Sequence, residues 1–246
     1  MTILIVDQLD SIVGSLASSV GKPEDQIRLM LCMYMGYPLG IILNLLVKGT
    51  TARHLFSVIT GFLLQLYMYR EQFWHSLVMT SITYALMVAL PRNKQARFVF
   101  IFVMLYLSYQ HISRMIRNFG GYDMDVTTFT MVLTAKLSAL AYCYKDGGEK
   151  DEKLLPEQKD KKVEKLPNVL ELLSYVYFPS ACIVGPFFEF ADFKMYIEKT
   201  GRYANIPSSG KYALLGFLRA KLCLVIHMGI ANYCYPAFCG TEEYAA

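Results

Sequence analysis

Charged residues are scarce in this sequence, and the patterns of a soluble fold are missing. Only 18% of the 246 residues are charged, whereas 54% are hydrophobic and the mean hydropathy is +0.33. Soluble domains usually have about 45–50% apolar residues, and here the excess is gathered in long blocks. Strand alternation is absent, which excludes an outer-membrane barrel. The chain is therefore interpreted as an α-helical membrane protein.

The motifs of soluble enzymes are also missing, since we find no GxSxG, Walker loop, HExxH or Rossmann fingerprint. A net charge of +4 is too mild for a nucleic-acid groove, so we expect no nucleic-acid partner. No cysteine belongs to a CxxC pair, and we expect neither a metal site nor a bound cofactor. We interpret the cysteines as small packing residues: Cys32, Cys143, Cys182, Cys223, Cys234 and Cys239.

The start of the chain lacks the basic segment and the cleavage site of a signal peptide. Apolar residues recur there at helical spacing: Ile3, Val6, Leu9, Ile12, Val13 and Leu16. Asp7, Asp10 and Ser11 fall elsewhere on the helical wheel. We predict an amphipathic helix over residues 1–21 that lies at the membrane surface before the first span.

Long apolar blocks follow one another along the rest of the chain. The candidate spans are residues 27–47, 54–69, 73–90, 97–113, 126–144, 169–184 and 211–238. We predict an all-α, polytopic transmembrane bundle with six or seven spans, formed by residues 1–246 as a single unit. Lys48, Arg53 and the cluster around Arg92 then fall on one side, which the positive-inside rule places in the cytosol.

One hydrophilic stretch interrupts the apolar blocks at residues 145–168. It holds seven lysines and seven acidic residues, together with Pro156 and Pro167. Such a segment has little to bury. We predict a solvated, flexible loop, which falls on the cytosolic side if the helix 126–144 also crosses the membrane.

Charged side chains inside apolar blocks are the first candidates for function, because they are costly in hydrocarbon. Lys136 lies mid-helix and either snorkels or pairs with an acid on a neighbouring helix. Glu189 lies near an apolar break. Arg219 and Lys221 either bind a phosphate-bearing ligand or mark the end of a span.

The four histidines differ in their surroundings. His54 and His75 lie at span edges and are interpreted as interfacial. His111 lies near the end of the fourth apolar block. Arg114 and Arg117 lie just beyond it and could face an anionic headgroup. His227 lies within an apolar run, where it is either a structural histidine or a general base.

Two longer segments, 122–147 and 175–197, together resemble the membrane-bound O-acyltransferase family, in particular its lysophospholipid acyltransferase branch. The first has an acidic-Thr turn that leads into a Lys-Leu-Ser helix ending near Asp-Gly, with matches at Asp125, Thr127, Met131, Lys136, Leu137, Ser138, Asp146 and Gly147. The second has Gly-Pro, then aromatic residues, then an acidic-aromatic step, with matches at Gly185, Pro186, Phe187, Phe188, Asp192 and Phe193.

The resemblance implies a multi-pass enzyme of the endoplasmic reticulum that acts in phospholipid remodelling. Such enzymes move a fatty acyl group from acyl-CoA, a co-substrate, to the hydroxyl of a lysophospholipid. It also implies that Lys136, Gly185 and Pro186 shape the reaction chamber rather than react. Gly-Pro would break a helix and bend the chain at membrane depth, which requires that protein buries the segment.

The resemblance further implies a catalytic histidine, helped by an upstream asparagine, in spans beyond the Gly-Pro segment. None of the four histidines matches that position, so we assign no catalytic residue and expect residues 1–246 to be an inactive N-terminal portion. Two alternatives stay open. One is a small transporter or channel lined by Lys136, Arg219 and His227, and the other is a non-catalytic membrane scaffold.

Overall fold

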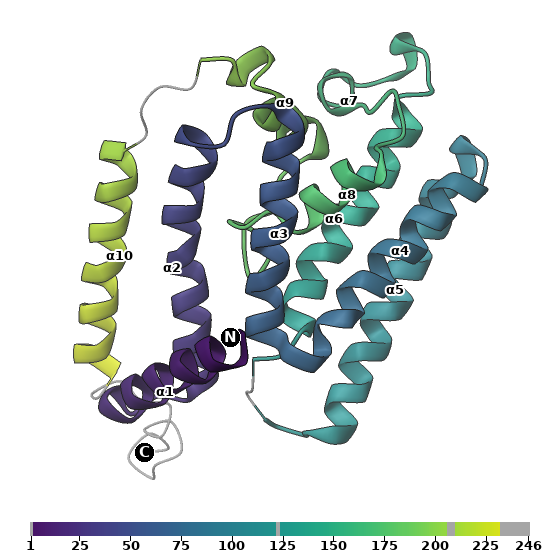
Figure 1. The fold of residues 1–246 in the computed structure, drawn as a ribbon. Coiled ribbons are helices and arrows are strands. Elements are labelled where there is room, and N and C mark those ends of the chain that lie inside the picture. The colour runs from purple at the N-terminus through teal and green to yellow at the C-terminus, as the bar shows by residue number, and fades with distance from the viewer. Residues whose placement is uncertain (1, 122–123, 206–209, 232–246) are drawn as a thin grey trace, which may run out of the picture. The chain divides into compact units, whose positions relative to one another are not determined.

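The computed structural model describes residues 2–121, 124–205 and 210–231, and every regular element within these ranges is a helix (Figure 1). The predicted all-α class is confirmed. The chain divides into two compact units, Met1–Gly201 and Arg202–Ala246, which are described separately. That residues 1–246 form a single unit stays a prediction.

The described part of the first unit contains six long helices and three short ones. The long helices are α1 (Thr2–Val20), α2 (Glu24–Leu45), α3 (Thr50–Tyr69), α4 (Trp74–Ala89), α5 (Arg92–Arg117) and α6 (Thr127–Asp146). The short helices are α7 (Pro156–Lys161), α8 (Val169–Val176) and α9 (Phe190–Glu198). Short 3-10 turns lie at Arg70–Phe73, Asp151–Lys153 and Gly201–Tyr203.

Local sequence explains where several of these helices begin. Pro23 precedes α2 and Pro91 precedes α5, where the fixed φ of proline suits a helix start. Asn168 caps α8 by accepting a 2.8 Å hydrogen bond from the backbone N–H of Glu171. The Glu171 carboxylate accepts in return from the Asn168 N–H, which completes a capping box.

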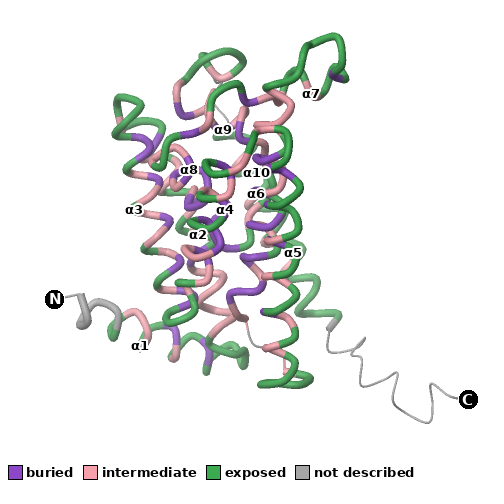
Figure 2. The backbone as a smooth tube through the Cα atoms, turned by 90° about the vertical axis from the view of Figure 1, so that its right-hand side faces the viewer, coloured by how far each residue is buried: buried purple, intermediate pink, exposed green. Residues whose placement is uncertain are grey.

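Helix α6 lies at the centre of the packing. Its inward face follows a helical period and is fully buried at Phe129, Leu133, Leu137 and Leu140. Helices α5 and α4 pack against it, while α3 packs against α2 and α8. Figure 2 shows the same pattern, with buried residues along the inner faces of the helices and exposed residues outside.

Three helices in the described residues are long and apolar enough to cross a membrane: α2, α5 and α10 (Gly210–Ala231). The predicted count of six or seven spans is therefore not confirmed. Helix α4 has 16 residues, and α3 buries the polar side chains of Arg53, His54 and Gln65. Polar residues that face other helices lower the apolar content of a segment without meeting lipid.

Helix α10 is the long helix of the second unit within the described residues. It carries Arg219, Lys221 and His227, while Cys234 and Cys239 lie outside the described residues. Arg219 and Lys221 are two positions apart, so they point to different sides of the helix. A phosphate-bearing ligand at Arg219 and Lys221 stays a prediction.

The hydrophilic stretch 145–168 folds back on the end of α6 rather than leaving it. Arg92 donates from Nε to the Tyr144 carbonyl at 2.6 Å and from Nη2 to the Val163 carbonyl at 2.7 Å. The Val163 N–H donates to the Cys143 carbonyl at 2.9 Å. The prediction of a solvated, flexible loop did not include these contacts, because they depend on a residue of α5.

Candidate functional site

Helix α8 ends earlier than predicted, and a proline explains why. The apolar block 169–184 was expected to stay helical as far as Gly185-Pro186, but α8 stops at Val176. Pro179 lies three residues later; it disfavours helical geometry at the preceding residue and has no N–H to donate. Residues 177–189 consequently form an irregular segment, which we call the Gly-Pro segment.

Side chains from α3 satisfy the backbone of this Gly-Pro segment. Gln65 donates from Nε2 to the Cys182 carbonyl at 2.7 Å, and the Tyr69 hydroxyl donates to the Ile183 carbonyl at 3.1 Å. Gln65 also accepts from the Ser76 hydroxyl at 3.0 Å. A buried carbonyl without a donor is costly, so these side chains make the irregular backbone tolerable inside the bundle.

Lys136 supplies a further donor from α6. Its Nζ lies 3.1 Å from the Tyr175 carbonyl oxygen, which has no helical donor because residue 179 is a proline. The amine also sits 4.9 Å from the ring centre of Tyr175 and 4.3 Å from that of Phe188. The Lys136 side chain as a whole is fully buried.

Both sequence interpretations of Lys136 are therefore wrong. A buried side chain does not snorkel, and among the described residues no carboxylate forms an ion pair with its amine. The partner is instead a carbonyl and two aromatic faces, 39 or more positions further along the chain. No sequence pattern indicates such a partner, although Pro179 identifies which carbonyl is left free.

Aromatic rings enclose the far end of the Gly-Pro segment. The Tyr175 hydroxyl donates to the Phe188 carbonyl at 2.7 Å, and the two rings meet edge-on with centroids 5.5 Å apart. The ring centroid of Phe193, on α9, lies 5.5 Å from the ring centroids of both Tyr175 and Phe178. Such ring contacts fix ring positions as well as burying area. The segment is thus closed on itself and packed against α9.

The Gly-Pro segment lies opposite the middle of the long helices. A Cβ built on Gly36 of α2 would lie 3.8 Å from the Cα of Ser180. On α3, a Cβ at Gly61 would overlap the Tyr177 carbonyl, so only glycine allows this close approach. Since α2 is long and apolar enough to cross a membrane, the irregular backbone lies level with the middle of that span.

The acidic-Thr turn before α6 is held by its own hydrogen bonds and by α5. The Asp125 carboxylate accepts from the Thr127 N–H at 3.1 Å and from the Thr127 hydroxyl. Arg114 lies 3.4 Å from the same carboxylate. Arg114 is thus engaged within the protein, whereas Arg117 is exposed.

The Asp-Gly end of α6 marks another close contact. The Asp146 carboxylate accepts from Gln158 of α7 at 3.0 Å, and a Cβ at Gly147 would overlap the Val163 carbonyl. Glu189, the acidic candidate near the apolar break, forms an ion pair with Lys161 at 3.3 Å. Hydrogen bonding to Glu189 raises the pKa of Lys161. The two family-like segments are therefore connected through α7.

The four histidines occupy separate places. His54 is buried and its Nδ1 lies 2.5 Å from the Ser174 hydroxyl of α8, so the prediction of an interfacial position is wrong for this residue. His75 bonds the Tyr106 hydroxyl at 2.8 Å. His111 lies near the end of α5 and His227 lies on α10. In the described residues none of the four forms an ion pair with a carboxylate.

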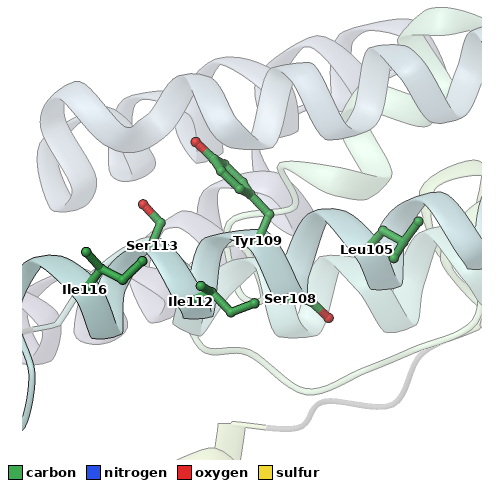
Figure 3. Close-up of a pocket in the computed structure, with 6 residues that line it drawn as sticks. All are labelled: Leu105, Ser108, Tyr109, Ile112, Ser113 and Ile116. Carbon is green, nitrogen blue, oxygen red and sulfur yellow. The ribbon is translucent and has the colours of Figure 1, made fainter.

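A shallow hollow lies on α5, and its lining comes from that helix alone (Figure 3). The lining residues are Leu105, Ser108, Tyr109, Ile112, Ser113 and Ile116. A hollow lined by one helix is part of an outer face, and its lining includes no carboxylate, histidine, lysine or arginine. We do not assign a ligand to it.

Comparison with known proteins shows that the chain is similar in sequence to membrane-bound acyltransferases. The profile of the membrane-bound O-acyltransferase (MBOAT) family matches residues 112–244. The "Lysophospholipid acyltransferase 5" proteins of Drosophila melanogaster and Mus musculus are 29% and 30% identical over 96% of this chain, covering 48% and 49% of their own lengths. The human "Membrane-bound glycerophospholipid O-acyltransferase 2" is 28% identical over 82% of this chain and 39% of its own length. The chain spans about half the length of the curated relatives it matches.

Proposed function

Because this chain belongs to the membrane-bound O-acyltransferase family, we propose that it contributes to acyl transfer from acyl-CoA to a lysophospholipid. In this reaction the lipid hydroxyl oxygen attacks the thioester carbonyl carbon. The carbon–sulfur bond breaks, CoA leaves as the thiol, and the hydroxyl proton passes through a base to the leaving sulfur. The names of the relatives, a lysophospholipid acyltransferase and a glycerophospholipid O-acyltransferase, support this reaction class.

We propose that the residues described here form a wall of the reaction chamber and hold no reacting group. The observation that carries this proposal is the irregular Gly-Pro segment, held opposite the middle of α2 by donors from Gln65, Tyr69 and Lys136. Irregular backbone at membrane depth is tolerated where it is buried in protein or lines a cavity. We infer that the bent segment closes one side of this chamber.

Acyl-CoA and a lysophospholipid are the proposed substrates, with no bound cofactor and no metal. We place the protein in the endoplasmic reticulum membrane as a multi-pass protein. The transporter alternative is less well supported, because Lys136 is enclosed by aromatic rings and a carbonyl instead of lining a polar path. A non-catalytic scaffold differs from our proposal only in its lack of substrate binding.

The test uses residues 1–246 and a chimera in which they replace the matched half of the mouse relative. Membranes that contain either protein are supplied with radiolabelled acyl-CoA and a panel of lysophospholipids, and labelled phospholipid is measured. We expect the chimera to transfer label. Transfer by neither protein, when both are present in the membrane, would contradict the proposal.

A photoactivatable acyl-CoA separates the alternatives for residues 1–246 themselves. We expect crosslinks to peptides around the Gly-Pro segment and α6, which unlabelled acyl-CoA suppresses. A scaffold would give no suppressible crosslink. Uptake of a small solute into vesicles without any acyl transfer would favour the transporter instead. Should residues 1–246 transfer label alone, alanine replacement of each histidine would identify the base, contrary to our proposal.

A further inference from the structure

Helix α1 presents three different faces, and this pattern identifies what it contacts. One face is turned to the protein, where Val13 and Ala17 are buried. A second face is apolar but open, with Ile12, Leu16 and Val20 exposed by 54%, 47% and 45%. These three residues are spaced by four, so they form one stripe along the helix.

The third face of α1 is polar. Asp7, Ser11, Ser15 and Ser18 are exposed there, on the opposite side of the helix from Leu16. The Ser15 and Ser18 hydroxyls donate to carbonyls one turn earlier, at 2.9 and 2.8 Å, so they satisfy themselves locally. Around the helix, the face packed against the protein is therefore followed by the exposed apolar face and then by the exposed polar face.

Ion pairs hold α1 in this rotation. The Asp10 carboxylate lies 3.3 Å from an Arg28 nitrogen of α2 and 2.5 Å from an Arg70 nitrogen just after α3. Asp10 thus bridges the ends of two long helices. Figures 1 and 2 both show α1 lying across the ends of these helices instead of beside them.

We propose that the stripe of Ile12, Leu16 and Val20 inserts into the lipid at one membrane surface, with the serine face turned to water. A helix that has water on one side and apolar contact on the other lies along the interface of a bilayer. Helix α1 crosses the N-terminal end of α2, which is a candidate membrane span. The exposed apolar stripe of α1 therefore lies where that span would leave the bilayer. The occupant is thus the lipid of the surrounding membrane, and the anchor is independent of the proposed acyl transfer.

The single tryptophan of the chain allows a direct test. Trp74 is replaced by Phe, which keeps an aromatic ring beside His75, and one tryptophan is introduced at Leu16 or at Ser15. The full chain is reconstituted in phosphatidylcholine vesicles that contain lipids brominated either near the headgroup or near the chain end. Fluorescence quenching by each lipid and by aqueous acrylamide is then measured.

We expect the Leu16→Trp variant to be quenched about twofold or more strongly by the shallow bromines than the Ser15→Trp variant, and acrylamide to show the reverse order. Stronger quenching at position 16 by the deep bromines would overturn the interfacial placement. Absence of lipid quenching at position 16 would show that another polypeptide covers the stripe. Equal quenching at both positions would overturn the three-face arrangement.

A second variant tests the anchor. Asp10→Asn removes both ion pairs and leaves the apolar stripe unchanged. In the Trp74→Phe background we expect the difference between positions 15 and 16 to shrink, because α1 can then rotate. Elution as a single detergent-solubilised species confirms that each variant is folded. An unchanged difference would show that Asp10 does not set the rotation.

Discussion

The amine of Lys136 lies 3.1 Å from the carbonyl oxygen of Tyr175, and the two residues also meet through the Tyr175 ring. In a continuing helix this carbonyl would accept from the N–H of residue 179. Residue 179 is a proline, so the donor comes from another helix instead. A single side chain of α6 therefore supplies the hydrogen-bond donor that the backbone lacks where α8 ends.

This relationship predicts an energetic coupling between Lys136 and Pro179. Lys136→Met should lower the free energy of unfolding in detergent by about 1–3 kcal/mol, because a buried carbonyl loses its donor. In the Pro179→Ala background the same change should cost about 1 kcal/mol less, since the substituted alanine has an N–H to offer. A double-mutant cycle measures the difference. Strictly additive effects would show that Lys136 does not replace the missing helical donor.

The Tyr69 hydroxyl can be removed with little change in side-chain volume. Tyr69→Phe removes the donor to the Ile183 carbonyl and should destabilise the protein by about 1–3 kcal/mol in detergent. Tyr109→Phe is the matched control, because Tyr109 is 60% exposed on α5. Thermal unfolding of the two variants is compared. Equal melting temperatures would mean that the Ile183 carbonyl finds another donor.

Two glycines within helices should respond in opposite ways to alanine. Helix propensity favours alanine by up to about 1 kcal/mol at both Gly61 and Gly40. At Gly61 the new Cβ would lie 2.6 Å from the Tyr177 carbonyl carbon, and overpacking of this kind costs about 1–3 kcal/mol. At Gly40 nothing lies within 4 Å. We expect Gly61→Ala to melt lower than the parent and Gly40→Ala to match or exceed it.

Arg92 should control how firmly the hydrophilic stretch is held. Its guanidinium bonds the Tyr144 and Val163 carbonyls and stacks 4.3 Å from the Tyr144 ring centre. Lysine cannot reproduce this forked and stacked contact. Arg92→Lys should therefore speed cleavage of residues 145–168 by a lysine-specific protease, whereas the exposed Arg97→Lys should not. Equal cleavage rates would show that the contacts of Arg92 do not hold the stretch.

Apolar block length and proline position predicted most of the helices within a few residues. Blocks 73–90 and 126–144 correspond to α4 and α6, and 27–47 corresponds to α2. The number of spans was harder, because a polar side chain inside a block can face another helix or water. His54 illustrates this, since its sequence position predicts an interfacial residue but its side chain is buried against Ser174.

The candidate site was predictable in its location but not in its contacts. Gly185-Pro186 indicated a break in the helix, while the break itself came earlier, at Pro179. The contacts of Gln65 and Tyr69 were not predicted, because a glutamine and a tyrosine four positions apart in an apolar block are equally typical of a packed or interfacial helix. Their role depends on carbonyls 114 or more positions away, which no local pattern encodes.

The order of the donors along the chain has a consequence for how the protein is made. Gln65, Tyr69 and Lys136 all precede the Gly-Pro segment, whose carbonyls they satisfy. The ribosome therefore synthesises both donor helices, α3 and α6, before the irregular backbone. Because an unsatisfied carbonyl costs several kcal/mol in hydrocarbon, that order spares the nascent chain an exposed intermediate.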